Sequence, residues 1–136
     1  MILIEHLYKM QVNSHFFEGE KVRDSIFGGF CDCSGTMFQK MWFDLNGKST
    51  LISECEKCWK NEAMIFDGSE LTSREEIEVV DRRDFSSVLK SILSNSEYEA
   101  LNSKWQSRDY NYNAYSRAKK KLNEVGLSPE EVTSYI

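Results

Sequence analysis

The chain has 136 residues, 40% of them hydrophobic, and a formal net charge of −5. This length indicates one domain or two small ones, and the acidic balance argues against a uniformly basic nucleic-acid binder. The charge is uneven, with a net −7 in residues 1–81 and +2 in residues 82–136. We therefore predict two domains with these boundaries, a β-rich first half and a helical second half.

The N-terminal segment predicts a strand and no targeting signal. Residues 2–12 alternate between apolar and polar side chains, as in a half-buried strand, and a short helix is the weaker alternative. The apolar start meets Glu5 and His6 at once, so it is too short and too polar for a signal peptide. No apolar run reaches membrane-spanning length. We expect a soluble, cytoplasmic protein that is not secreted and does not contact a membrane.

All four cysteines lie in two close pairs, Cys31-Asp32-Cys33 and Cys55-Glu56-Lys57-Cys58. Two pairs of thiols on tight turns are a simple way to supply the four soft donors of a tetrahedral zinc site. Four cysteine ligands would close the site, so the metal would act as a structural brace that contributes folding free energy.

The residues between and after the cysteine pairs predict a small antiparallel sheet. Residues 36–43 are rich in aromatic and large apolar side chains, and residues 50–53 read as the returning strand. Asn46-Gly47 between them is a strong hairpin signal, because both residues tolerate positive φ. Residues 63–66 predict a third strand.

We call the turns that carry the cysteine pairs, at residues 31–35 and 55–58, the first and second knuckle. Residues 29–68 then have the order knuckle, strand, turn, strand, knuckle, strand, which resembles the zinc-ribbon family. The resemblance implies that one structural Zn²⁺ is held by four ligands, namely Cys31, Cys33, Cys55 and Cys58. It also implies a rigid docking platform of the kind that serves in transcription machinery. Iron bound by the same sulfurs, a redox pair at Cys55 and Cys58, and disulfides are the alternatives that the residues leave open.

The second half is predicted to be a small helical bundle. Residues 69–83 form a transition, in which Ser73–Glu76 fits a capping box for a short helix and residues 77–80 suit a strand equally well. From residue 84 onward the hydrophobic period is helical, which together with the first half gives an α+β fold. The helices are predicted at residues 84–93, 96–105, 113–125 and 128–136, the last of them carrying Val132, Tyr135 and Ile136.

Residues 104–121 interleave basic and aromatic side chains. Cations pair with phosphates and aromatic faces stack on bases, so this segment is a candidate nucleic-acid surface. Its alternatives are an ordinary solvated helix face or a contact with an acidic protein. The predicted nucleic-acid-binding residues are Lys104, Arg108, Arg117, Lys119, Lys120 and Lys121.

No catalytic constellation is apparent, so we expect neither an enzyme nor a small-molecule substrate. The leading prediction is a small zinc-binding regulatory factor of nucleic-acid metabolism, associated with transcription, which contacts nucleic acid or the polymerase machinery. The alternative is a zinc-braced protein–protein adapter without nucleic-acid binding, whose contact surface would include Phe38 and Trp42.

Overall fold

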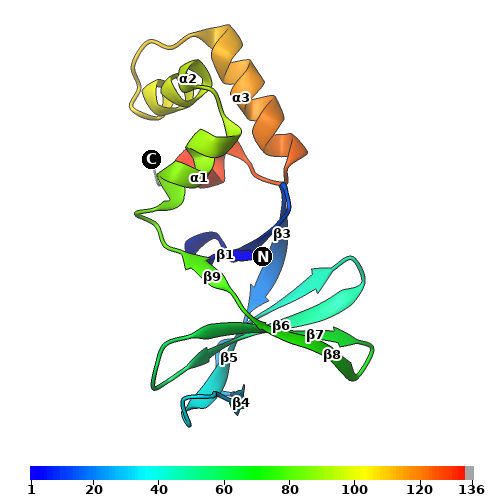
Figure 1. Cartoon of the computed structure of the whole chain (residues 1–136). Coiled ribbons are helices and arrows are strands. Elements are labelled where there is room, and N and C mark those ends of the chain that lie inside the picture. Colours follow the sequence, from blue (N-terminus) through cyan, green and yellow to red (C-terminus); the bar gives the residue numbers. More distant parts are fainter. Residues whose placement is uncertain (134–136) are drawn as a thin grey trace.

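The structure is a computed structural model that describes residues 1–133. A β-rich first part is followed by helices, so the α+β prediction is confirmed (Figure 1). The strands are β1 (Ile2–Ile4), β2 (Lys9–Val12), β3 (His15–Lys21), β4 (Phe27–Phe30), β5 (Thr36–Leu45), β6 (Lys48–Cys55), β7 (Asn61–Asp67), β8 (Glu70–Glu76) and β9 (Glu78–Val80). The helices are the 3-10 turn η1 (Glu5–Leu7), α1 (Phe85–Ile92), α2 (Asn95–Trp105), α3 (Tyr112–Glu124) and α4 (Pro129–Thr133).

The strands form one sheet that nearly closes into a barrel. Its order is β8-β7-β6-β5-β3-β2-β1-β9, and β4 pairs with β5 beside this path. Only Ile77 separates β8 from β9, so these two act as one bent strand. It pairs with β7 at its start and with β1 at its end. Every other pairing is antiparallel and the circuit holds an odd number of strands, so β9 meets β1 in parallel.

Two local predictions in this half are wrong. Residues 2–12 form a hairpin, because the chain reverses through η1 and through Tyr8, whose φ is 54°. The apolar alternation continues on both sides of the turn and so does not reveal it. The capping box predicted at Ser73–Glu76 does not form a helix, because this segment pairs with β7 as strand β8. Tertiary pairing here overrides a local signal that is weak without packing.

The predicted hairpin after the first cysteine pair is confirmed. β5 and β6 pair along their length, and Asn46 and Gly47 turn between them with φ of 55° and 85°. Positive φ at both central residues matches the right-handed twist of the flanking strands. β7 follows as the third strand, and its pairing with β6 runs from Glu54 to Ser49.

Helices form at each predicted segment, and α2 begins at Asn95, one residue before its predicted start. The N-cap of α2 is Ser94, whose hydroxyl accepts the N–H of Glu97 while the Glu97 carboxylate accepts the N–H of Ser94. Gly126 ends α3 with φ 91°, and a Cβ there would lie 2.5 Å from the carbonyl oxygen of Phe16. Ser128 caps the start of α4, since its hydroxyl and its N–H both donate to the Glu131 carboxylate. The predicted end of the last helix, residues 134–136, lies outside the described residues.

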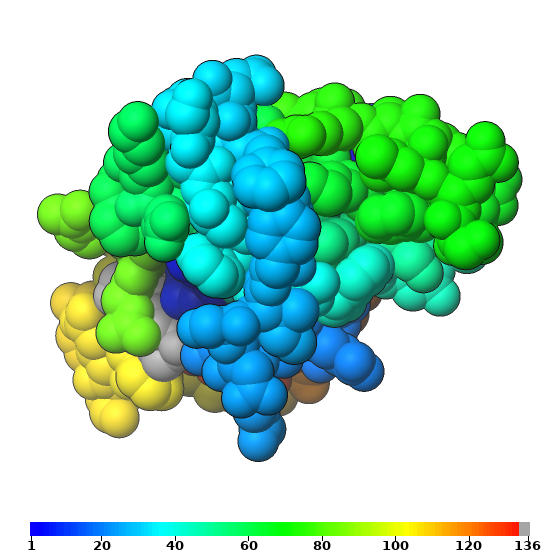
Figure 2. All heavy atoms as spheres, turned by 90° about the horizontal axis from the view of Figure 1, so that it is seen from below, coloured from blue at the N-terminus to red at the C-terminus, as the bar shows by residue number. Residues whose placement is uncertain are grey.

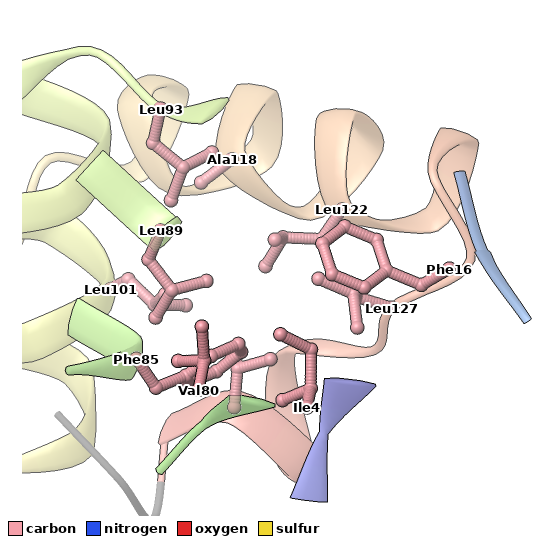
Figure 3. Packing of buried hydrophobic residues seen from close by; sticks show 11 residues of the cluster. Ile4, Phe16, Val80, Phe85, Leu89, Leu93, Leu101, Ala118, Leu122 and Leu127 are labelled. Carbon is pink, nitrogen blue, oxygen red and sulfur yellow. The ribbon is translucent and has the colours of Figure 1, made fainter. Parts of the chain in front are cut away.

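Hydrophobic side chains form two large clusters. One fills the barrel: Leu3, Met10, Met41, Phe43, Leu45, Ile52, Ala63 and Ile77. The other lies between the barrel and the helices, where Ile4, Phe16 and Val80 point from the strands toward Phe85, Leu89, Leu122 and other helical residues (Figure 3). Lys9 on β2 adds a polar link, since its Nζ donates to the Gly126 carbonyl at 2.7 Å and lies 2.9 Å from Glu131. The two halves therefore share a core.

Among residues 1–133, no helix combines the length and the apolar character that crossing a bilayer requires.

Candidate metal centre

The four cysteine thiols converge at one end of the barrel. Their Sγ atoms all lie within 4.8 Å of one another, with Cys31 to Cys58 at 3.6 Å and Cys33 to Cys55 at 3.4 Å. All four are free thiols. Zn–S bonds of about 2.3 Å in a tetrahedron place the sulfurs about 3.8 Å apart, so this donor set fits one zinc ion.

Two tight turns hold the thiols in place. In the first knuckle, the N–H of Cys31 donates to the Gly35 carbonyl at 3.0 Å, and Ser34 has φ 72°. Gly35 lies against the second pair, because a Cβ at this residue would be 2.6 Å from Cys55 Sγ. In the second knuckle, the N–H of Cys55 donates to the Lys60 carbonyl at 2.9 Å. Any side chain at Gly35 would collide with Cys55 Sγ and with Lys57 Cβ, so this position requires glycine.

The pKa values of two of the thiols are shifted in opposite directions, as expected for a cluster in which ionising one thiol disfavours ionising the next. The backbone N–H of Cys58, helped by that of Lys57, lowers the pKa of the Cys55 thiol to about 6. The backbone N–H of Lys60 lowers the pKa of Cys58, but desolvation and the neighbouring thiols outweigh it and raise that pKa to about 12. Neighbouring thiolates disfavour one another's charge, and a divalent cation would remove that penalty.

Charged side chains surround the first knuckle. Glu62 on β7 is buried, accepts a hydrogen bond from Arg74 on β8, and lies 3.3 Å from Lys60 Nζ. Lys60 also lies 3.7 Å from Asp32, and Arg74 also donates to the Phe30 carbonyl. In Figure 2, the blue segment that leads into β4 crosses this face of the molecule beside the green residues of β8.

Comparison with known families decides what this chain is related to. The profile described as AF0631-like N-terminal beta-barrel domain matches residues 1–79, and the AF0631-like C-terminal four-helix domain matches residues 82–135. The chain belongs to the AF0631-like family. It is 38% identical over 134 residues to an uncharacterized protein of Archaeoglobus fulgidus, covering 98% of this chain and 97% of the relative. No solved structure matches it.

The zinc-ribbon prediction is wrong. Residues 29–68 belong to the AF0631-like barrel domain, and their strands continue into a sheet that includes β1, β3, β8 and β9. A hairpin between two cysteine pairs occurs both in zinc ribbons and in this barrel, so the local sequence pattern does not distinguish the two folds. The family descriptions name no metal, and zinc is therefore a proposal that depends on the donor geometry alone.

Exposed aromatic side chains flank the knuckles of the AF0631-like barrel. Phe30, directly before Cys31, is 70% exposed and packs edge-on against the exposed Phe27. Trp59, directly after Cys58, is 68% exposed and has φ 64°, a strained conformation for an aromatic residue. Phe38 and Trp42, predicted as the exposed contact of an adapter, are half-buried instead. The exposed aromatic side chains of this region therefore lie beside the cysteine pairs and not along the β5–β6 hairpin.

The six predicted nucleic-acid-binding residues do not form one free surface. Lys121 Nζ lies 2.7 Å from the carboxylate of Glu97 on α2, and Arg117 Nε lies 3.8 Å from it. Lys104 packs its ammonium over the Tyr115 ring, 4.1 Å from the centroid. Within residues 1–133, no ion pair involves the other three, which are exposed: Arg108, Lys119 and Lys120.

Glu97 is a structural residue that the sequence pattern did not single out. Its side chain is 2% exposed, and burial by itself would raise its pKa. The ammonium of Lys121 and the N–H and hydroxyl of Ser94 outweigh burial and lower the pKa to about 2. A depressed carboxyl pKa contributes stability above the unfolded-state value of about 4.5, and this stability is lost as the pH falls toward 2.

We expect Glu97→Gln to lower the free energy of unfolding at pH 7 by as much as about 3 kcal/mol. The difference between wild type and variant should shrink as the pH falls from 5 to 3, because the wild-type carboxylate loses its advantage. Urea unfolding at several pH values measures this difference in unfolding free energy. The effects of acid on all other groups are the same in both proteins and therefore cancel. Glu99→Gln, at an exposed position on the same helix, is the control and should change little. A difference that stays constant with pH would contradict the assignment.

Proposed function

We propose that this chain is a zinc-binding interaction protein, in which one structural Zn²⁺ braces the barrel so that the two knuckles can bind a partner protein. The single observation that carries the proposal is the approach of four free thiols to within 4.8 Å of one another. Thiolates suit zinc, and four of them leave no open coordination position for a substrate. The ion would therefore stabilise the fold, and the protein would act by binding and not by catalysis.

The knuckles supply the features of a contact surface. Phe30 and Trp59 flank, in the sequence, two thiols that are 3.6 Å apart, and both rings are exposed. Exposed aromatic side chains on a rigid support are typical anchors of protein interfaces. The positive φ of Trp59 costs conformational energy, and backbone outliers of this kind cluster at functional sites.

The charge of this half favours a basic partner. Residues 1–81 carry a net charge of −7, and Asp32 in the first knuckle has a side chain that is 92% exposed. We infer that the partner presents a basic segment with apolar anchor residues, since opposite charge speeds encounter and fixes orientation. The transcription role expected above depended on the zinc-ribbon resemblance and loses that support.

The test is an NMR titration of isotope-labelled, zinc-loaded protein with an alternating Lys-Leu peptide and the matching Glu-Leu peptide. The Lys-Leu peptide should shift the amides of residues 30–34 and 58–60, and Trp59→Ser should weaken its binding at least about fivefold, since a hot-spot residue contributes more than 1 kcal/mol. Trp105→Ser, on the exposed surface of α2, is the control. Equal binding of both peptides, or no shifts at the knuckles, would contradict the proposal.

Nucleic-acid contact is the second candidate, and the outer face of α3 favours it. Lys119 and Lys120 line a shallow depression together with Ser116, Asn123 and Glu124, and Tyr112 is 72% exposed on the same helix. Replacing Lys119 and Lys120 by alanine should weaken binding to duplex DNA or RNA and lower the salt slope by about 1–2. Arg117 and Lys121 are poor test positions because they pair with Glu97. Absence of binding at low salt would eliminate this candidate.

A further inference from the structure

The barrel has an open seam beside the thiols. Among the described residues, β4 pairs only with β5, and β8 pairs only with β7, so each leaves one strand edge without a ladder. Arg74 bridges these two edges directly, because its guanidinium on β8 donates to the carbonyl of Phe30 at the end of β4. The same side chain lies 3.7 Å from the sulfur of Met37 on β5. Side-chain contacts thus take the place of a ladder across this seam.

Lys60 makes the second contact to the same knuckle. Its Nζ lies 3.7 Å from Asp32 Oδ2, and both Lys60 and Arg74 pair with the buried carboxylate of Glu62. Phe30 precedes Cys31 in the chain and Asp32 follows it. Lys60 and Arg74, which both pair with Glu62, therefore contact the residues on either side of Cys31.

We propose that Lys60 and Arg74 are positioning residues of the metal centre, which clamp the chain on both sides of Cys31 and so link metal binding to closure of the β4–β8 seam. The inference rests on the proposed zinc centre and adds two residues that touch no metal. Four thiolates around Zn²⁺ carry a net charge of −2, so nearby cations also make this state more favourable. Residues that hydrogen-bond a metal ligand typically change metal affinity by about 10–100-fold when replaced, and Lys60 and Arg74, which contact the flanking residues Asp32 and Phe30, should fall at the lower end of this range.

The test compares zinc affinities of full-length variants, measured by competition with a chromophoric chelator. Arg74→Gln and Lys60→Met should each bind zinc at least about tenfold more weakly than wild type. Arg74→Lys keeps the charge but cannot reach Glu62 and the Phe30 carbonyl in the same fork geometry, so its affinity should be intermediate. Lys9→Met removes a similarly buried cation that joins β2 to α4, and should leave the zinc affinity unchanged.

Hydrogen exchange separates positioning from a merely structural role. Zinc should protect the amides of β4 and β8 in wild type, and this protection should be largely lost in Arg74→Gln even when the zinc concentration is high enough to load it. Affinities within twofold of wild type, with unchanged protection, would overturn the clamp while leaving the zinc centre intact. A wild-type protein that binds neither zinc nor cobalt would overturn the proposed metal centre and the clamp with it.

Discussion

Replacing Cys55 with serine is expected to abolish zinc binding and to lower the free energy of unfolding by several kcal/mol. Cys55 is fully buried at the end of β6, and its thiol lies 3.4 Å from that of Cys33. Binding of structural zinc contributes directly to folding free energy, about 10–16 kcal/mol in isolated zinc-finger peptides. The loss should be smaller here, because the barrel also has its own hydrophobic cluster.

Denaturant unfolding with and without a strong chelator measures this loss and supplies its own control. The chelator should destabilise wild type down to the level of Cys55→Ser and should have no further effect on the variant. Such non-additivity is expected only if both treatments remove the same interaction. Equal effects of the chelator on both proteins, or no effect on wild type, would contradict the metal centre.

Phe16→Ala is expected to lower the free energy of unfolding by about 3–5 kcal/mol, which is the usual cost of truncating a buried phenylalanine. The ring is 2% exposed and belongs to the cluster that joins the strands to the helices (Figure 3). The N–H of Phe16 also donates to the Val125 carbonyl at 2.8 Å, just after α3. Because the cluster includes residues of both halves, we expect the barrel and the helices to lose stability together.

Helical circular dichroism follows the helices. The fluorescence of Trp42 on β5 follows the barrel when Trp59 and Trp105 are replaced by phenylalanine in every protein compared. The two unfolding curves should coincide in wild type and shift together in Phe16→Ala. Phe17→Ala, on the opposite face of the same strand and half-buried, is the matched control and should cost clearly less. Two separate transitions, with only the helical one shifted by Phe16→Ala, would show that the halves do not share a core.

The features predictable from the sequence were those encoded within a few residues. Asn46-Gly47 specifies its own hairpin turn, and Ser128-Pro129 specifies its own helix start, because short-range backbone preferences decide both. The two cysteine pairs predicted a common site because close pairs of thiols on tight turns are a simple way to bring four soft donors to one metal ion. Each of these signals is independent of what the rest of the chain packs against.

The features that could not be predicted depend on partners far away in the sequence. Ser73–Glu76 became a strand because β7 offered it a free edge, although its local pattern favours a helix. Lys121 and Arg117 resembled a free basic face because the sequence does not show that Glu97, 24 residues from Lys121, is buried between the helices. Arg74 reaches Phe30 over 44 residues, and no periodic pattern marks such a pair.

The metal content of the native protein, measured by native mass spectrometry together with elemental analysis, is the sharpest test of the proposed zinc centre. We expect one zinc per chain, released by strong chelator with loss of protection at β4 and β8, and absent from Cys55→Ser. A native protein that carries no metal, has four reactive thiols and keeps its tertiary packing in chelator would contradict it.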